Sequence, residues 1–167
     1  NRDYSKTLEL EVAGVPHVFA WGGLHGAIPK YHGEGWFVNV DVASYYPSLM
    51  LVYKWLSRNV HDPSKYAEIY HTRLKLKAEK NPMQQPYKIV LNSTYGAMKD
   101  KHNAMYDPRQ ANNVCVGGQL LLLDLIERLE DHCEIIQSNT DGILVKFAGM
   151  KILKLSLRHI SEPTRPE

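Results

Sequence analysis

The 167-residue sequence predicts a mixed α+β fold, with an antiparallel sheet, flanking helices and a short two-helix insertion. Three observations predict this class. Polar and apolar residues alternate over 36–42 (WFVNVDV), as in a strand with one buried face. Two apolar segments flank a polar turn over 134–147, which is typical of a β-hairpin. Helical stretches fill the sequence between them, and neither a repeat nor a linker divides the chain.

The elements follow in order along the chain. Residues 6–23 alternate weakly, as a strand does, and residues 22–35 are a glycine-rich loop or hairpin. After the strand at 36–42, Pro47 suits the first turn of a helix that continues to residue 56. Further helices are predicted over about 66–80, 87–98 and 114–132, with two prolines separating the first pair. Residues 100–113 are predicted to be a loop, and the C-terminal tail receives no predicted structure.

Composition excludes several classes of protein. A hydrophobic content of 44% can form a compact core, and a net charge of +2 is too small to indicate a nucleic-acid partner by itself. Cys115 and Cys133 lack CxxC spacing, so neither a disulfide framework nor a zinc site is indicated. Apolar runs such as 120–123 are far too short to span a bilayer. We therefore expect a soluble cytoplasmic protein with no membrane partner.

The first candidate site is the string DVASYYPS at 41–48. Asp41 ends the predicted strand and a tight turn follows it at once. A carboxylate beside free turn N–H groups can hold a divalent metal and an anion side by side, as a triphosphate with magnesium requires. The alternative is a solvated Asp41 beside a helix cap, with Tyr45 and Tyr46 as core aromatics. The string alone favours neither.

The second candidate site is the string KIVLNSTYG at 88–96. Lys88, Asn92, Tyr95 and Lys99 fall on one helical face, which is either a solvated face or a surface with a lysine for phosphate and an aromatic ring for a base. The preceding helix carries a similar stripe. We expect the two helices to present one cationic, aromatic surface that suits a nucleoside triphosphate, to which the preceding helix contributes Tyr66, Tyr70, Arg73, Lys77 and Lys80.

The third candidate site is the hairpin string SNTDG at 138–142. An Asp before Gly is most often a turn former. Asp141 nevertheless supplies a second carboxylate for Asp41. Two carboxylates from separate strands can bridge two magnesium ions about 3.5–4 Å apart, as phosphoryl transfer requires.

These three strings, in this order, closely resemble the polymerase motifs of family B DNA polymerases, above all the bacteriophage-type members. The family motifs are Asp-x-x-Ser-Leu-Tyr-Pro-Ser, Lys-x-x-x-Asn-Ser-x-Tyr-Gly and Tyr-x-Asp-Thr-Asp-Ser. The second motif matches at every specified position, and the first departs only by Tyr45 in place of Leu. The resemblance covers about residues 18–147. It implies a template-directed DNA polymerase that transfers a deoxynucleoside monophosphate from a dNTP to the 3′-hydroxyl of primer–template DNA. If the source is a phage, the resemblance places the protein in the host cytoplasm.

The resemblance also implies the roles of individual residues. Asp41 and Asp141, with the Val42 carbonyl, would hold two Mg²⁺ ions, or Mn²⁺ in their place. Ser44 and Tyr45 would offer N–H groups to the triphosphate, and Tyr46 would exclude a ribose 2′-hydroxyl. The remaining implied residues are Lys88 as the catalytic lysine on the triphosphate, Arg73 and Lys77 as further cations, Asn92, Tyr95 and Gly96 at the nascent base pair, and Gly22 and Gly23 at the template strand.

The third motif departs from the family pattern. Asn139 stands where the family has its first Asp, and Gln137 replaces the usual Tyr. The second Asp, which is the principal metal ligand of the family, is retained as Asp141. Fewer carboxylates should lower the local negative charge and weaken metal binding, but the chemistry remains feasible.

The resemblance divides the chain into palm and fingers. It assigns 1–65 and 100–147 to the palm, 66–99 to the fingers and 148–167 to a C-terminal tail. The three motifs lie at 41–48, 88–96 and 137–142. Neither exonuclease motifs nor a thumb is recognisable, so we expect the exonuclease and thumb regions of a longer polymerase as partners.

Two other functions are consistent with the sequence. One is a weak or inactive polymerase remnant that binds DNA or nucleotide, which Asn139 favours and Asp41, Lys88 and Asp141 oppose. The other is a different palm-type enzyme such as a nucleotide cyclase, which the lysine-bearing string KIVLNSTYG opposes because cyclase palms have no fingers.

Overall fold

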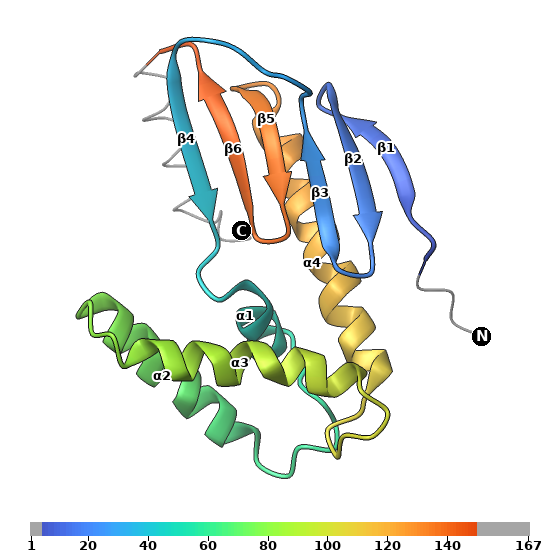
Figure 1. The fold of residues 1–167 in the computed structure, drawn as a ribbon, viewed down its shortest axis with the longest axis vertical. Helices are drawn as coiled ribbons and strands as arrows, with labels where there is room; N and C mark the ends of the chain where they lie inside the picture. Colours follow the sequence, from blue (N-terminus) through green and yellow to red (C-terminus); the bar gives the residue numbers. More distant parts are fainter. Residues whose placement is uncertain (1–4, 150–167) are drawn as a thin grey trace, which may run out of the picture. The chain divides into compact units, whose positions relative to one another are not determined.

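The computed structural model describes residues 5–149 and confirms the mixed α+β class. Within that range a six-stranded antiparallel sheet has the order β1-β2-β3-β5-β6-β4, which places β4 at one edge beside β6 (Figure 1). The strands are β1 (Leu8–Val12), β2 (Val15–Ala20), β3 (Gly23–Ala27), β4 (Trp36–Asp41), β5 (Glu134–Asn139) and β6 (Gly142–Phe147). The helices are α1 (Tyr45–Val52), α2 (Pro63–Ala78), α3 (Gln84–Lys99) and α4 (Pro108–Leu129).

The chain forms two compact units. The sheet unit comprises the described residues up to Val42 and from Gln119 onward, and the helical unit comprises Ala43–Gly118. The whole sheet and the second part of α4 belong to the sheet unit, while α1, α2, α3 and the first part of α4 belong to the helical unit.

The sheet unit has one apolar face and one polar face. The second part of α4 lies along one face of the sheet (Figure 1), and its Leu122, Ile126 and Leu129 side chains belong to the buried core there. Val38 and Val40 pack against this core, whereas Phe37, Asn39 and Asp41 are exposed, as the alternation of β4 predicts. The buried core residues are Val15, Leu24, Leu122, Ile126, Leu129, Ile135, Ile143, Val145 and Phe147.

Two-residue turns fold residues 8–27 into β1, β2 and β3, where the sequence predicts weak strand-like alternation over 6–23 and then a glycine-rich loop or hairpin. Ala13 and Gly14 both have positive φ, at 52° and 72°, and they close the β1–β2 hairpin. A turn with positive φ at both central residues matches the twist of the strands that it joins. Trp21 and Gly22 connect β2 to β3, also as a two-residue turn, but neither residue has a positive φ.

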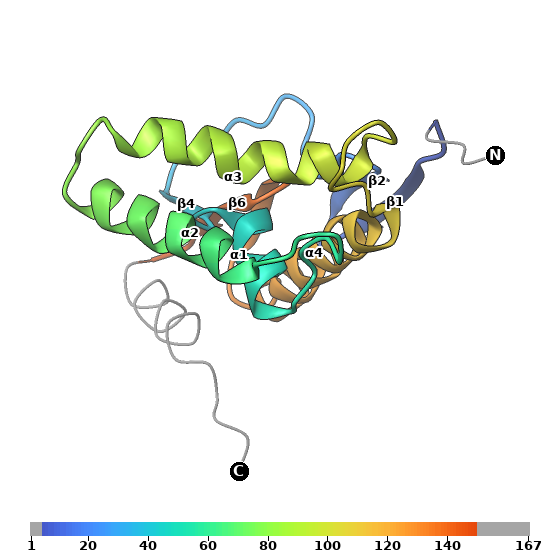
Figure 2. The same cartoon turned by 90° about the horizontal axis from the view of Figure 1, so that it is seen from below.

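The helical unit is built on the packing of α2 against α3. Figure 2 shows these two helices side by side, joined at one end by the short proline-bearing loop. The Tyr66 hydroxyl of α2 donates to the Leu91 carbonyl of α3 at 3.1 Å. The buried core of this unit consists of Met50, Leu56, Tyr66, Leu91, Met98, Ala111 and Val114.

Two predicted boundaries are wrong for local reasons. Helix α4 begins at Pro108 rather than residue 114, because Asp107 accepts the Gln110 N–H at 3.4 Å and so caps a helix start within a polar stretch. Helix α1 ends at Val52 rather than residue 56, because Lys54 has a positive φ of 55° and breaks the helical path. Within 5–149, none of the helices combines the length and apolar character needed to cross a membrane.

Candidate functional site

The sheet unit brings Asp41 and Asp141 onto neighbouring segments. Asp41 ends β4 and pairs with Gly142, the first residue of β6. Asp141 lies in the two-residue turn between β5 and β6. The Val42 N–H donates to the Asp141 carbonyl at 2.8 Å, which ties the end of β4 to this turn. Both Asp side chains are exposed, so both carboxylates are open to a ligand.

The carboxylate of Asp41 is held by its neighbours. The Asn39 amide donates to Asp41 Oδ2 at 2.9 Å. Gly142 lies beside the other oxygen, and a Cβ at this position would overlap Asp41 Oδ1. A hollow of about 290 Å³ opens here, and Asp141 is not among the residues that line it. They are Asn39, Asp41, Gln137, Asn139, Gly142, Ile143 and Leu144.

This donor set fits Mg²⁺ when substrate oxygens complete the coordination. The described residues contain no group of three or more His, Cys, Asp or Glu side chains that could hold a metal alone. Two exposed carboxylates and the Val42 carbonyl remain. Mg²⁺ is typically bound through one or two carboxylates, with water and substrate phosphates at its other positions.

Asn139 stabilises the turn between β5 and β6. Its side-chain oxygen accepts the Thr140 N–H at 3.0 Å, an interaction that an Asp at the same position could also make. It lies in the same row of the sheet as Gly142 and Asp41. The amide therefore preserves the hairpin but supplies no negative charge beside Asp41.

The predicted template element lies against the same hairpin. Gly23 has a φ of 140°, and a Cβ at this position would collide with the Thr140 side chain. The Thr140 hydroxyl lies 3.3 Å from His25 Nε2 on β3. The β2–β3 turn, with Gly22 and Gly23, is thus packed beside the turn that carries Asp141, and only glycine fits this approach at position 23.

The first motif continues into the helical unit at the start of α1. Ser44 is left-handed, with φ 55° and ψ 48°, and its side chain makes no cap hydrogen bond. The Tyr45 ring is buried, and its hydroxyl donates to the Gly118 carbonyl at 2.7 Å. Burial raises the pKa of Tyr45 to about 12. Tyr45 is therefore a core residue with a satisfied hydroxyl.

Tyr46 and Tyr95, which the sequence predicts at one site, contact each other. Their ring centroids are 4.8 Å apart in an edge-on arrangement. Lys99 Nζ lies 5.3 Å from the centroid of the Tyr95 ring. Burial is the largest cause of a raised pKa for Tyr46, which also interacts with Cys115. This cluster joins α1 to α3 within the helical unit.

The predicted stripe on α3 faces solvent. Lys88, Asn92 and Lys99 are exposed, while Leu91 and Met98 are buried on the neighbouring face of the helix. Gly96 is also exposed, and a Cβ there would find no atom within 4 Å. The described residues of the chain therefore give no packing reason for a glycine at this position.

The predicted cationic surface on α2 requires a correction. Tyr66 and Arg73 are only 6% and 5% exposed, because this face of α2 packs toward α3. Lys77 and Lys80 are exposed, and Lys80 lies beyond the helix end with a φ of 54°. Arg73 Nε is buried without a hydrogen-bond partner among the described residues. The two helices thus do not present all of these side chains on one solvent surface.

Sequence reasoning missed two residues of this site. It placed Asn39 on the same strand face as Asp41 but assigned it no role, and it did not single out Gly142. The signal for Asn39 was its i, i+2 spacing from Asp41, which puts two polar side chains together on one strand face.

Comparison with known proteins gives a partial match. No family model matches the sequence. DNA polymerase II of Escherichia coli (strain K12) is 29% identical over 98 residues, which are 57% of this chain and 12% of that polymerase. The chain thus spans about an eighth of the length of this curated relative. It contains a region distantly related to a DNA polymerase.

Proposed function

We propose that this chain is the nucleotidyl-transfer core of a family B DNA polymerase. In this role a primer 3′-hydroxyl attacks the α-phosphate of a templated dNTP, and pyrophosphate leaves. The observation that carries the proposal is the 2.8 Å hydrogen bond from the Val42 N–H to the Asp141 carbonyl, which ties together the two segments that bear the motif aspartates. The partial similarity to a DNA polymerase supports it.

Asp41, Asp141 and the Val42 carbonyl would hold two Mg²⁺ ions, or Mn²⁺ in their place. When bound, such ions act as Lewis acids and stabilise charge on the attacking and leaving oxygens. The chain's own contribution is to keep the Asp41 carboxylate in one orientation. Asn39 donates a hydrogen bond to Oδ2, and Oδ1 occupies the space that a side chain at Gly142 would fill.

The helical unit would bind the incoming nucleotide. We assign Lys88, Arg73 and Lys77 to the triphosphate, together with the backbone N–H groups of Ser44 and Tyr45. The exposed Lys77 and Lys88 side chains support this assignment, whereas Arg73 is only 5% exposed.

The sugar and the base would meet the tyrosine cluster. We assign Tyr46 to the exclusion of a ribose 2′-hydroxyl, and Asn92, Tyr95 and Gly96 to the nascent base pair. The contact between Tyr46 and Tyr95 supports a shared role, and the open space at Gly96 leaves room for a close approach. Gly22 and Gly23 would contact the template strand.

Primer extension tests the proposal. The full chain is incubated at low salt with a primed DNA template, dNTPs and Mg²⁺ or Mn²⁺, beside Asp41→Asn and Asp141→Asn. Asp131→Asn is the matched control, because Asp131 is an exposed carboxylate outside the site. We expect templated incorporation by the wild type and the control, and its loss in both site variants.

The second candidate function is a remnant that binds DNA or nucleotide without turnover. Asn139 favours it, since position 139 stabilises the turn but carries no charge. Metal-dependent dNTP binding that requires Asp41, without incorporation, would support this function. Incorporation that persists in Asp41→Asn would show that the assigned aspartates are not the catalytic pair.

A further inference from the structure

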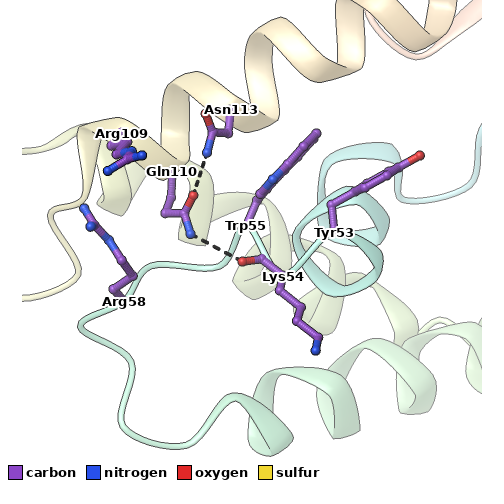
Figure 3. Close-up of a pocket in the computed structure, with 7 residues that line it drawn as sticks. All are labelled: Tyr53, Lys54, Trp55, Arg58, Arg109, Gln110 and Asn113. Carbon is purple, nitrogen blue, oxygen red and sulfur yellow. Dashed lines mark hydrogen bonds between the residues drawn. The ribbon is translucent and has the colours of Figure 1, made fainter.

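A second hollow lies within the helical unit, on residues that none of the three motifs contains. It has a volume of about 410 Å³, within the range of about 300–1,000 Å³ that is common for ligand sites. Figure 3 shows an aromatic pair on one side of Gln110 and two arginines on the other. The lining residues are Tyr53, Lys54, Trp55, Arg58, Arg109, Gln110 and Asn113, and no carboxylate is among them.

The two arginines differ in how they are held. Arg58 donates from Nε to Asp107 Oδ2 at 2.8 Å and from its second guanidinium nitrogen to Oδ1 at 2.9 Å. Asp107 is buried, and this bidentate pair fixes the Arg58 side chain while leaving it 61% exposed. Arg109 forms none of the ion pairs found within residues 5–149. The hollow is therefore electropositive, with one oriented and one uncompensated guanidinium.

The aromatic pair is preformed. Tyr53 and Trp55 stack with their ring centroids 4.6 Å apart and their planes at 19°. The Trp55 ring packs so closely over Gly117 that a Cβ there would collide with it. Tyr53 stays 45% exposed. The pair is a rigid π-surface at the edge of the hollow.

Gln110 is also fixed in position. Its amide nitrogen donates to the Lys54 carbonyl at 3.3 Å, and its oxygen accepts from the Asn113 amide at 2.8 Å. A π-surface, two guanidinium groups and a polar floor together form the combination that binds single-stranded nucleic acid, in which bases stack on aromatic rings and phosphates contact cations.

We propose that this hollow binds an unpaired segment of single-stranded DNA. A base stacks on the Tyr53–Trp55 pair, and backbone phosphates contact Arg58 and Arg109. Unpaired bases expose the π-faces that duplex stacking covers, so single strands are favoured over duplex. An acidic peptide would use the arginines and leave the rings unused. The choice of DNA rests on the proposed polymerase function.

Fluorescence anisotropy of a labelled oligo(dT) tests this proposal with the full chain. A length of about 12 nucleotides lies within the known site sizes of about 4–16. EDTA is present throughout, so that metal-dependent binding at Asp41 and Asp141 does not contribute. We expect Tyr53→Ala to weaken binding at least about fivefold, the lower end for loss of one base stack. Arg109→Gln should reduce the slope of log affinity against log salt by about 0.7.

Two controls match these changes. Phe37→Ala removes a ring that is 43% exposed, close to the exposure of Tyr53, and Arg128→Gln removes the same charge from an exposed position in the sheet unit. Both should bind like the wild type. Wild-type affinity in Tyr53→Ala, equal affinity of the wild type for a hairpin duplex, or no oligo(dT) binding by the wild type would each overturn the proposal.

The outcomes separate this proposal from the polymerase assignment. Oligo(dT) binding that depends on Tyr53 and Arg109, in a protein that extends no primer, would support the proposed single-stranded DNA site and count against the polymerase function. Primer extension by a protein that shows no oligo(dT) binding would overturn the proposed single-stranded DNA site and leave the polymerase function standing.

Discussion

Asn39 and Asp41 lie two residues apart on the exposed face of β4, and a 2.9 Å hydrogen bond joins their side chains. The bond uses one carboxylate oxygen, Oδ2, and Gly142 leaves space beside the other. Partners that orient a metal-binding carboxylate typically change metal affinity by about 10–100-fold when they are replaced. Under the proposed function, Asn39 is a positioning residue for Asp41.

Replacing Asn39 should change the metal requirement more than the fold. We expect Asn39→Ala to raise the Mg²⁺ concentration for half-maximal primer extension about tenfold. The melting temperature should stay close to that of the wild type, because Asn39 is exposed. Titration of Mg²⁺ in the extension assay measures the shift, and Lys6→Ala, at an exposed position before β1, is the control. An unchanged Mg²⁺ dependence would remove Asn39 from the site.

His17 is the residue whose titration should affect stability. It is 1% exposed on the core side of β2, and burial is the main cause of its lowered pKa. The register places His17, Gly26 and Ser138 in one row across β2, β3 and β5. His17 Nε2 and Ser138 Oγ are both buried without a hydrogen-bond partner among the described residues. A neutral His17 is thus favoured in the folded state.

A depressed folded-state pKa fixes the sign of the pH dependence. Below about pH 6.5, the ordinary pKa of His, the unfolded chain takes up a proton that folded His17 resists. The free energy of unfolding therefore decreases as the pH is lowered, until the pH reaches the lowered pKa of folded His17. Urea unfolding between pH 7.5 and 5 should show this loss, at up to about 1.4 kcal/mol per pH unit. His17→Leu should lack this component, and the exposed His132→Gln should retain it. Equal slopes in the wild type and His17→Leu would contradict the assignment.

At the scale of elements, α3 contains a conflict between helix stability and the proposed site. Gly96 lies within the helix, where glycine is less favourable than alanine by about 0.8–1.0 kcal/mol. A Cβ there would meet no atom within 4 Å. The conformation of Gly96 is not among those with positive φ, so the backbone does not require glycine either.

Gly96→Ala should therefore stabilise the chain and impair its function. We expect a rise in melting temperature of about 1–4 °C, from a gain of up to about 1 kcal/mol. Primer extension should fall if a nascent base pair approaches the backbone at this position. Ala97→Gly makes the reverse change at the neighbouring position of α3, so it should lower the melting temperature and serves as the control for helix propensity. Full activity in Gly96→Ala would remove the assigned contact.

The elements also show what the sequence can predict. Local periodicity was sufficient for β4, the β5–β6 hairpin and the solvent-facing stripe of α3. It was insufficient where a distant partner or an unusual φ decides the structure. The β1–β2 turn depends on a positive φ at Ala13, and the region at the start of α4 includes a contact between Arg58 and Asp107, which lie far apart in sequence. Arg73 was misplaced because its burial follows from the packing of α2 on α3.

In the candidate site, too, local sequence predicts some features and distant contacts determine the others. Asp41 and Asp141 were predicted from short strings, and the structure brings their segments together through one backbone hydrogen bond. The hydrogen bond between Asn39 and Asp41 depends on side-chain orientation, and the space at Gly142 depends on the register between β4 and β6. Motifs predict which residues are candidates for reaction, whereas strand pairing and register determine which side chains lie beside them.

At the scale of the whole molecule, folding and metal binding should be independent. Each unit has its own buried apolar core, formed without any charged site residue. The site offers two exposed carboxylates, and the described residues contain no group of three or more metal-binding side chains of the His, Cys, Asp and Glu types. A metal bound mainly through substrate oxygens adds little to the stability of the free protein, because it binds the free folded state weakly.

Metal removal should therefore abolish primer extension and leave the fold intact. We expect EDTA to shift the melting temperature by less than about 2 °C, which for a chain of this size is a change of less than about 1 kcal/mol in the free energy of unfolding. Excess Mg²⁺ or Mn²⁺ should restore primer extension. Asp107→Ala is the contrasting variant, since it removes a buried carboxylate that caps α4 and binds Arg58. It should lower the melting temperature by several degrees, with or without EDTA. A large destabilisation by EDTA alone would mean that the protein holds a metal without substrate, which two exposed carboxylates do not explain.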